Sequence, residues 1–264
     1  MPDNLNLMRK NLLFFLSLAL LWTAATAQTI NAAYVSALYA KYPVTKSNFC
    51  TDCYLWVNPY YVSIGDVKRH MPVVTYEHFT KTNNDQVAVL KVPRDGIYAA
   101  WHSVTGQPNE DNVYAAANKL VRQTDPKAVI AKGHCEAWIL NAFCYDAVIL
   151  SDTYTFNAGL ENQKQNVGTE IATENITREK LKTMDVDVWC GTWGDQGAFT
   201  DGRITDTYPA FYWKIIRAGG ETTCYWMPNV AAATKATLPQ CIVTYAQLVK
   251  NLQFDPQKIF PPKP

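Results

Sequence analysis

Residues 127–182 have the sequence KAVIAKGHCEAWILNAFCYDAVILSDTYTFNAGLENQKQNVGTEIATENITREKLK, and this stretch decides the fold. The β-branched and aromatic residues in 127–132 and 147–156 are typical of strands. Residues 166–182 have the apolar spacing of a helix, with Val167 and Ile171 on one side. We therefore expect a strand, a loop, a second strand and a helix in succession.

Polar side chains gather at the ends of these expected elements. His134 closes the first strand, and the second strand leads into Asn157. Helical residues four apart share one face, so the following residues are expected along a single face: Asn166, Glu170, Glu174 and Arg178. The whole unit would bring together one histidine, two asparagines, one glutamate and two cations: His134, Asn157, Asn166, Glu174, Lys132 and Arg178.

This combination of side chains suits the hydrolysis of a phosphodiester. Histidine can accept a proton from water near neutral pH, which makes His134 the candidate general base. Charge that grows on the phosphate must be met by a divalent cation and basic side chains, here Lys132 and Arg178. Mg²⁺ prefers oxygen ligands and keeps most of its waters, so Asn166 could supply one oxygen and Glu174 could hold the waters.

Three motifs resemble the DNA/RNA non-specific endonuclease family of the ββα-metal (His-Me finger) nucleases. They are Ala131-Lys132-Gly133-His134, then Asn157-Ala158-Gly159-Leu160-Glu161, and then Asn166 with Glu174 eight residues on. Residues 188–192 and 209–214 resemble two later core strands of that family. Residues 244–255 resemble its C-terminal helix, so the resemblance covers most of the chain.

The resemblance implies an α+β, ββα-metal nuclease fold with a central, mainly antiparallel sheet flanked by helices. It also implies a metal-dependent endonuclease that cuts DNA and RNA with little base preference and leaves 5′-phosphates. In that family the histidine matching His134 is the general base, and the asparagine matching Asn166 binds Mg²⁺, with Mn²⁺ as a possible substitute. Asn157 and Glu174 match residues around that site, and Arg178 matches an arginine that contacts phosphate.

The chain also departs from the family pattern. Ala131 and Lys132 stand where the commonest motif has Asp-Arg, and lysine keeps the charge but loses the bidentate fork. Gly159-Leu160-Glu161 replaces the usual Ala-Pro-Gln, and Glu170 occupies a position where tryptophan is expected. None of these changes removes an atom that the proposed hydrolysis needs.

The rest of the chain favours a single α+β domain over residues 28–264. Further strands are expected where Val, Ile, Tyr and Trp are enriched: 86–92, 186–192 and 211–217. Helices are expected over 112–123 and 245–252, the second capped by Thr244. The tail from Phe254 contains four prolines and should lie extended over the surface.

Residues 1–27 have the composition of a signal peptide. Arg9 and Lys10 precede an apolar run too short to span a bilayer, and small residues follow up to Ala27. Cleavage near Ala27 would release the protein outside the cell and off the membrane; an uncleaved anchor is the alternative. Asn175-Ile176-Thr177 is the only N-glycosylation sequon, which fits a secreted glycoprotein.

Cysteine usage gives a separate expectation. The chain has seven cysteines beyond the leader: Cys50, Cys53, Cys135, Cys144, Cys190, Cys224 and Cys241. In an oxidising compartment we expect three disulfides and one odd thiol, or an intermolecular bridge. The spacing of Cys50 and Cys53 also occurs in zinc and redox motifs, but a structural disulfide fits better because no second pair at zinc-finger spacing accompanies it.

Bulk charge gives the nucleic-acid hypothesis no support. Removing Asp3, Arg9 and Lys10 with the leader leaves 22 basic and 22 acidic residues, so only a local basic groove could attract nucleic acid. A second hypothesis is therefore a catalytically inactive secreted binding or matrix protein on the nuclease fold. A third is a secreted phosphodiesterase that acts on small nucleotides.

Each candidate residue also has an ordinary structural interpretation. His134 could be a hydrogen-bonded structural residue, and Glu174 with Arg178 could be a surface pair on a helix. Asn157 could be a turn residue and Asn166 a helix N-cap. The remaining histidines, at positions 70, 78 and 102, belong to no pattern and receive no role. The sequence leaves the oligomeric state open.

Overall fold

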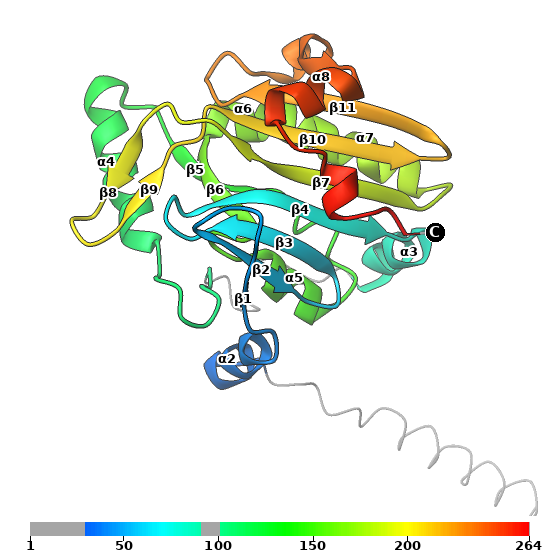
Figure 1. The fold of residues 1–264 in the computed structure, drawn as a ribbon, viewed down its shortest axis with the longest axis horizontal. Helices are drawn as coiled ribbons and strands as arrows, with labels where there is room; N and C mark the ends of the chain where they lie inside the picture. Colours follow the sequence, from blue (N-terminus) through cyan, green and yellow to red (C-terminus); the bar gives the residue numbers. More distant parts are fainter. Residues whose placement is uncertain (1–29, 91–100, 264) are drawn as a thin grey trace, which may run out of the picture.

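The computed structural model describes residues 30–90 and 101–263 of the 264-residue chain, and its core is one large antiparallel sheet (Figure 1). The eight strands lie in the order β1-β2-β3-β4-β7-β10-β11-β12, and every neighbouring pair is antiparallel. Their bounds are Thr45–Lys46, Cys53–Val57, Tyr61–Asp66, Met71–Phe79, Val186–Trp193, Phe211–Ala218, Glu221–Pro228 and Ile242–Val243. The expected α+β class with a mainly antiparallel sheet is thus confirmed.

Both faces of the sheet are covered. Successive side chains along a strand point to opposite faces, so each central strand contributes to two cores. On β10, Tyr212 and Ile216 face a core shared with helix α7 (Ile171–Leu181) and the 3₁₀ helix η2 (Lys235–Cys241). Trp213 and Ile215 face the opposite core, shared with helix α8 (Tyr245–Leu252). Figure 1 shows α7 on the far side of the sheet and α8 with the C-terminal tail on the near side.

A strand–loop–strand–helix unit is present, but its second strand is not the expected segment 147–156. Strand β5 (Ile130–His134) pairs antiparallel with β6 (Ala158–Asn162), and His134 lies opposite Ala158. After β6 come a short helical turn, α6 (Gln163–Gln165), a π-helical turn, η1 (Asn166–Glu170), and then α7. The unit therefore reaches its helix without a break, and the loop between β5 and β6 spans residues 135–157.

The remaining elements surround this unit and one end of the sheet. Helices α2 (Ala32–Ala40) and α5 (Tyr145–Ser151) share a core with β2 and β3. Helix α4 (Asp111–Thr124) packs with β5, β6 and the hairpin of β8 (Ala198–Thr200) and β9 (Thr205–Thr207). Helix α3 (Lys81–Leu90) follows β4, and α9 (Pro256–Ile259) interrupts the tail.

Two expected strands are wrong, because both segments are helical. The first, over 86–92, lies in α3 as far as Leu90; positions 91–92 are outside the described residues. The second, over 147–156, is α5 followed by irregular chain. Residues 147–151 are all buried, so this part of the helix shows no polar face, and a short apolar run of this kind cannot be told from a buried strand by periodicity.

Other local expectations are confirmed. Strands cover 186–192 and 211–217, a helix covers 112–123, and α8 begins and ends at the expected residues. Thr244 caps α8 in a reciprocal capping box with Gln247. The tail after Phe254 lies against the sheet, where Trp189 donates a hydrogen bond to the carbonyl of Phe260 (2.9 Å), although one turn of it is helical.

The expectation of three disulfides is wrong for this structure, which contains one, Cys50–Cys53, among the described residues. Cys224 and Cys241 belong to cores on opposite faces of the sheet, which separates their thiols. Cys144 contacts the Tyr60 hydroxyl at 3.3 Å and accepts the N-cap hydrogen bond of α5. The buried thiols of Cys135 and Cys190 contact each other as thiols, and burial raises the pKa of both.

The proposed leader, residues 1–27, lies outside the described residues. Within residues 30–90 and 101–263, no helix is both long enough and apolar enough to cross a membrane.

Candidate active site

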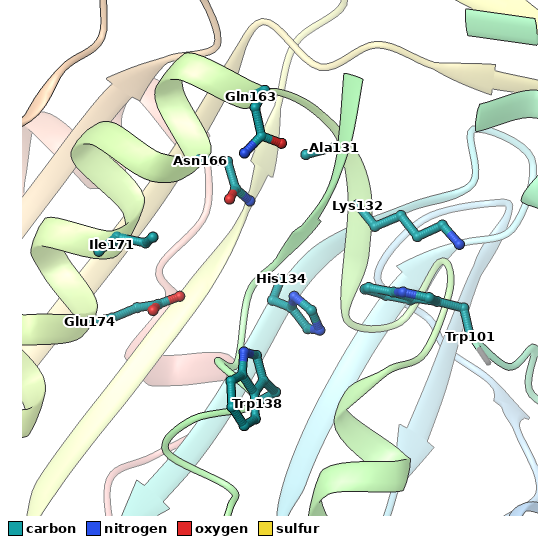
Figure 2. A pocket seen from close by; sticks show the side chains of 9 residues that line it. All are labelled: Trp101, Ala131, Lys132, His134, Trp138, Gln163, Asn166, Ile171 and Glu174. Carbon is teal, nitrogen blue, oxygen red and sulfur yellow. The ribbon is translucent and has the colours of Figure 1, made fainter. Parts of the chain in front are cut away.

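A cleft of about 330 Å³ opens beside the end of β5 and the start of the helical segment after β6 (Figure 2). It is lined by Trp101, Ala131, Lys132, His134, Trp138, Gln163, Asn166, Ile171 and Glu174. Figure 2 shows Asn166 and Glu174 projecting from the helical segment toward His134. Three of the six candidate site residues thus face one another across this cleft.

His134 is fixed by a carboxylate that comes from the loop between the two strands. Its Nε2 lies 2.8 Å from Oδ1 of Asp152, and both residues are buried. A carboxylate accepts hydrogen bonds, so it favours the tautomer with the proton on Nε2 and leaves Nδ1 as the proton acceptor. The ring of Trp101 lies 4.5 Å from the imidazole, centroid to centroid, and covers one side. His134 therefore has the orientation and partner that a general base requires.

Asn157 does not line the cleft. Its side chain is fully buried, accepts a hydrogen bond from the Glu136 amide (2.7 Å) and donates to the Glu136 and Ser151 carbonyls (2.9 and 2.7 Å). These bonds connect the chain just after His134 to the chain just before Asp152. Asn157 thus holds the two halves of the His134–Asp152 pair together.

The expected four-residue repeat along one helix face is wrong, because the helix begins with a π turn. The Ile171 amide donates to the Asn166 carbonyl, five residues back, so the wider turn brings Asn166 and Ile171 to the same side. The residues that line the cleft are accordingly 163, 166, 171 and 174. Gly168 lets this turn lie against the Ala233 backbone, with which a Cβ at that position would collide.

The displaced residue of that repeat, Glu170, points into the core. It forms an ion pair with Lys214 of β10, and both side chains are almost completely buried. Burial is the largest influence and would lower the pKa of Lys214, but the surrounding groups, first among them Glu170, together raise that pKa. Glu170 anchors the helical segment to the central sheet and does not belong to the cleft.

Asn166 is oriented by the glutamate that ends the second motif. Its Nδ2 donates to Oε2 of Glu161 at 2.6 Å, so the amide oxygen is the atom left to act as a ligand. Glu161 is fully buried, and burial followed by the negative charge of Glu170 raises its pKa, which the Asn166 hydrogen bond opposes. Gly133 leaves room for this carboxylate, since a Cβ there would overlap it.

The cleft fits a divalent cation of the Mg²⁺ type. Mg²⁺ selects oxygen donors and keeps several waters. Asn166 offers an oriented amide oxygen and Glu174 a carboxylate, both on the wall opposite His134. These are the residues that would hold the ion.

The two candidate cations, Lys132 and Arg178, do not point into the space that His134, Asn166 and Glu174 face. The Lys132 ammonium is 2.6 Å from Asp111 and 5.2 Å from the centre of the Trp101 ring, and Figure 2 shows it turned toward Trp101. Arg178 is exposed and lines a neighbouring hollow with Asn175 and Lys182, one helical turn beyond Glu174. The structure therefore places Lys132 at the rim of the cleft and Arg178 beyond it.

Sequence reasoning missed Asp152, Trp101 and the role of Glu161. Asp152 follows α5, a segment expected to be a strand, so its position beside His134 could not be derived. Trp101 comes from a part of the chain to which no element had been assigned. The sequence did contain a signal for Glu161, because this glutamate replaces the glutamine that is usual at that position in the family motif.

Comparisons with known proteins give the family and the fold of the chain. The sequence model of a family described as DNA/RNA non-specific endonuclease matches residues 42–257. Among solved structures, the chain is similar to one of an EndoG/EndoGI complex that concerns the mechanism of EndoG inhibition. The TM-score is 0.56 and the identity 16%, over 77% of this chain and 86% of that chain, a likeness that shows the fold. No curated protein matches.

Proposed function

The chain belongs to the DNA/RNA non-specific endonuclease family, and from that premise we propose that it is a secreted, Mg²⁺-dependent enzyme that hydrolyses DNA and RNA with little base preference. The observation that carries this proposal is the cleft in which His134, held by Asp152, faces Asn166 and Glu174. A structural histidine would not need an oxygen-donor wall opposite its acceptor nitrogen.

In the proposed reaction, Nδ1 of His134 accepts a proton from a water molecule as that water attacks phosphorus. The new bond joins the water oxygen to phosphorus, and the bond from phosphorus to the 3′-oxygen breaks. The products are a 5′-phosphate and a 3′-hydroxyl, whose proton comes from solvent water. Asp152 stabilises the imidazolium that forms, and Trp101 keeps bulk water from one side of the ring. Mg²⁺, when bound at Asn166, supplies charge compensation for the phosphate and the leaving oxygen.

The two cations are proposed to act on the substrate backbone. Lys132 would exchange its Asp111 partner for a phosphate, which requires only a rotation of a long side chain at the rim. Arg178 would contact a phosphate farther along the strand, because it lies one turn beyond Glu174 on the same helix. A polynucleotide that follows α7 would pass both residues, whereas a small nucleotide would not reach Arg178.

Secretion and glycosylation belong to the same proposal. The leader-like composition of residues 1–27 supports export, and the sequon places a glycan on Asn175, which is exposed on α7. Asn175 lines the same hollow as Arg178, so a glycan there would border the proposed substrate path without occupying the cleft around His134.

The test is plasmid nicking by the purified secreted protein with Mg²⁺ and with EDTA, beside His134→Ala prepared identically. We expect cleavage by the wild type with Mg²⁺, and its loss on chelation or substitution. Intact plasmid from a folded wild-type protein under every divalent metal tested would overturn the proposal and favour a binding protein. Cleavage confined to a small chromogenic diester would favour the nucleotide phosphodiesterase.

A further inference from the structure

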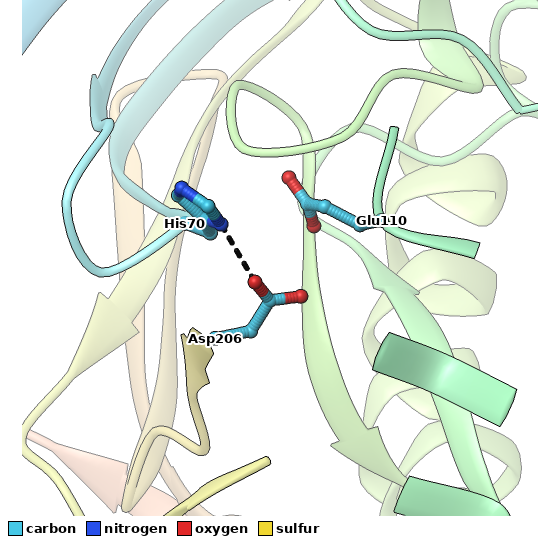
Figure 3. Close-up of side chains that lie close together, drawn as sticks. All are labelled: His70, Glu110 and Asp206. Atoms are coloured by element: carbon cyan, nitrogen blue, oxygen red, sulfur yellow. Dashed lines mark hydrogen bonds and ion pairs between the residues drawn. The ribbon is translucent and has the colours of Figure 1, made fainter. Parts of the chain in front are cut away.

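A second histidine–aspartate pair lies away from the cleft, where three distant segments meet (Figure 3). His70 belongs to the turn between β3 and β4, Glu110 directly precedes α4, and Asp206 is the middle residue of β9. One potential ligand atom from each lies within 4.8 Å of the other two. His70 Nδ1 is 2.6 Å from Oδ1 of Asp206, and Figure 3 shows Glu110 directed toward both.

Two carboxyl groups in this cluster have no accessible surface and an oxygen without a partner. Thr155 donates to Oε1 of Glu110 at 2.5 Å, which leaves Oε2 without a hydrogen-bond partner among the described residues. Oδ2 of Asp206 is likewise without one. A buried carboxylate oxygen without a donor is costly, so two that face each other require either a proton or a cation between them.

The types of ligand atom in this cluster indicate which cations it would bind. An imidazole nitrogen with two carboxylates suits a first-row transition ion such as Zn²⁺, whereas Mg²⁺ and Ca²⁺ select oxygen alone. Zn²⁺ bound about 2.0–2.2 Å from each ligand would hold the ligand atoms roughly 3.4 Å apart. Side-chain movements of about 1 Å would reach that arrangement from the present one.

We propose that His70, Glu110 and Asp206 form a structural site for a divalent transition metal ion, separate from the Mg²⁺ cleft. The ion would neutralise the two buried carboxylates and fasten the β8–β9 hairpin and the start of α4 to the β3–β4 turn. The backbone already joins two of these segments, where the Thr207 amide donates to the Arg69 carbonyl at 2.9 Å. Through Thr155 the site also braces residues 152–157, which carry Asp152 and Asn157.

The experiment measures metal content and thermal stability, neither of which depends on nuclease activity. The secreted protein is purified without chelator, passed through metal-free buffer and assayed for bound metal. Demetallated protein is then titrated with Zn²⁺. The wild type is compared with Glu110→Gln and His70→Asn; asparagine tolerates the positive φ of 53° at position 70. Asn166→Ala reports metal held in the cleft.

We expect one tightly held transition ion per chain, retained in Asn166→Ala and lost in Glu110→Gln. Zn²⁺ at about 100 times its Kd should raise the Tm of the wild type by about 5 to 10 °C and leave that of Glu110→Gln unchanged. A wild-type protein that holds no transition metal, and whose Tm does not respond to Zn²⁺, would overturn the proposal and assign a shared proton to the two carboxyl groups. Metal lost in Asn166→Ala but kept in Glu110→Gln would also overturn it.

If the variants at positions 70 and 110 do not fold, the wild type and Asn166→Ala still decide the matter. Replacement of the ion by Co²⁺ should give the visible absorption of a nitrogen- and oxygen-ligated ion in the wild type and in Asn166→Ala. A spectrum of fully hydrated Co²⁺ in both proteins would contradict the site.

Discussion

Two histidine–aspartate pairs among the described residues are buried and have similar hydrogen-bond distances, although one pair uses Nε2 of its histidine and the other uses Nδ1. In one, His134 lies 2.8 Å from Asp152; in the other, His70 lies 2.6 Å from Asp206, and all four residues are buried. Their surroundings differ. The first pair adjoins an open cleft with oxygen donors on the opposite wall, whereas the second meets another buried carboxyl group, Glu110.

The comparison shows that a hydrogen-bonded histidine acquires its role from what faces it. A free ring nitrogen at a solvent-filled cleft can receive a proton from water and release it again. A ring nitrogen enclosed with two carboxyl groups has no route for a substrate and can only share a proton or bind an ion. The following changes test this distinction, from the largest expected effect to the smallest.

The matched substitutions His134→Ala and His70→Asn should separate the two roles most strongly. Loss of a general base lowers turnover by roughly 10²- to 10⁴-fold, so His134→Ala should lose nicking at temperatures where it is still folded, even though Tm falls because the buried Asp152 carboxylate loses its partner. His70→Asn should lower Tm more than it lowers kcat. Rates from plasmid nicking and Tm values from circular dichroism measure both. Near-wild-type turnover in His134→Ala would remove the assignment of the base.

Asp152→Asn tests whether the carboxylate positions the base. An amide can present either its oxygen or its NH₂ group to the ring, so the tautomer with a free Nδ1 is no longer enforced. We expect kcat to fall by about 10- to 100-fold with little change in KM, because the substrate itself does not contact Asp152. A rise in KM at constant kcat would instead indicate a role in substrate binding.

Substitutions of Glu161 test the orientation of Asn166, the proposed metal ligand. Glu161→Leu removes the acceptor for Asn166 Nδ2 and should raise the Mg²⁺ concentration for half-maximal nicking by about 10-fold, at the lower end of what such supporting groups contribute. Glu161→Gln keeps an acceptor oxygen and restores the residue usual in the family, so it serves as the control. Equal Mg²⁺ requirements in both variants and the wild type would refute the orienting role.

Glu77 and Glu136 are two further buried carboxyl groups, and no histidine belongs to their pair. They provide a reference for the cluster around Glu110, because we propose no metal ion between them. Burial raises the pKa of Glu136 to about 7, and the adjacent Glu136 adds to the effect of burial on Glu77. A raised carboxyl pKa in the folded state stabilises the protein below the unfolded pKa, near 4.5, and this contribution is lost as the pH rises through 7.

Glu136→Gln should therefore have a Tm close to that of the wild type at pH 4.5 and a Tm several degrees higher at pH 8. Zn²⁺ should not change the difference, in contrast to the cluster around Glu110. Thermal melts over this pH range measure it. A difference in Tm that is constant with pH would show that Glu136 does not titrate in the folded protein.

Helices and strands whose bounds depend on neighbouring residues could be predicted from the sequence. Segments whose conformation depends on burial in the core could not. The capping box of Thr244 and Gln247 lies within four residues, so α8 was predicted at its true bounds. Strands β7 and β10 have the β-branched and aromatic content of central strands. The segment 147–151 is buried on every side, and nothing in its composition distinguishes the helix that forms from a strand.

The candidate site divides in the same way. His134, Asn166 and Glu174 were predicted from their motifs and do line one cleft. Glu170 was expected on the same face, but the π turn shifts it out of that row, and it pairs with Lys214 in the core. The pattern of side chains does not reveal where a helix replaces a hydrogen bond four residues back by one five residues back.

The family, the α+β class, the candidate base and the candidate oxygen ligands opposite it could all be read from the sequence alone. These follow from residue types at short spacing, which local backbone geometry converts directly into position. Only the tertiary structure decided that Asp152 holds His134 and that Asp206, 136 residues after His70, pairs with it. Such partners come together because apolar segments distant in the sequence are buried against one another and bring their loops into contact. The sequence positions of the two residues do not predict that contact.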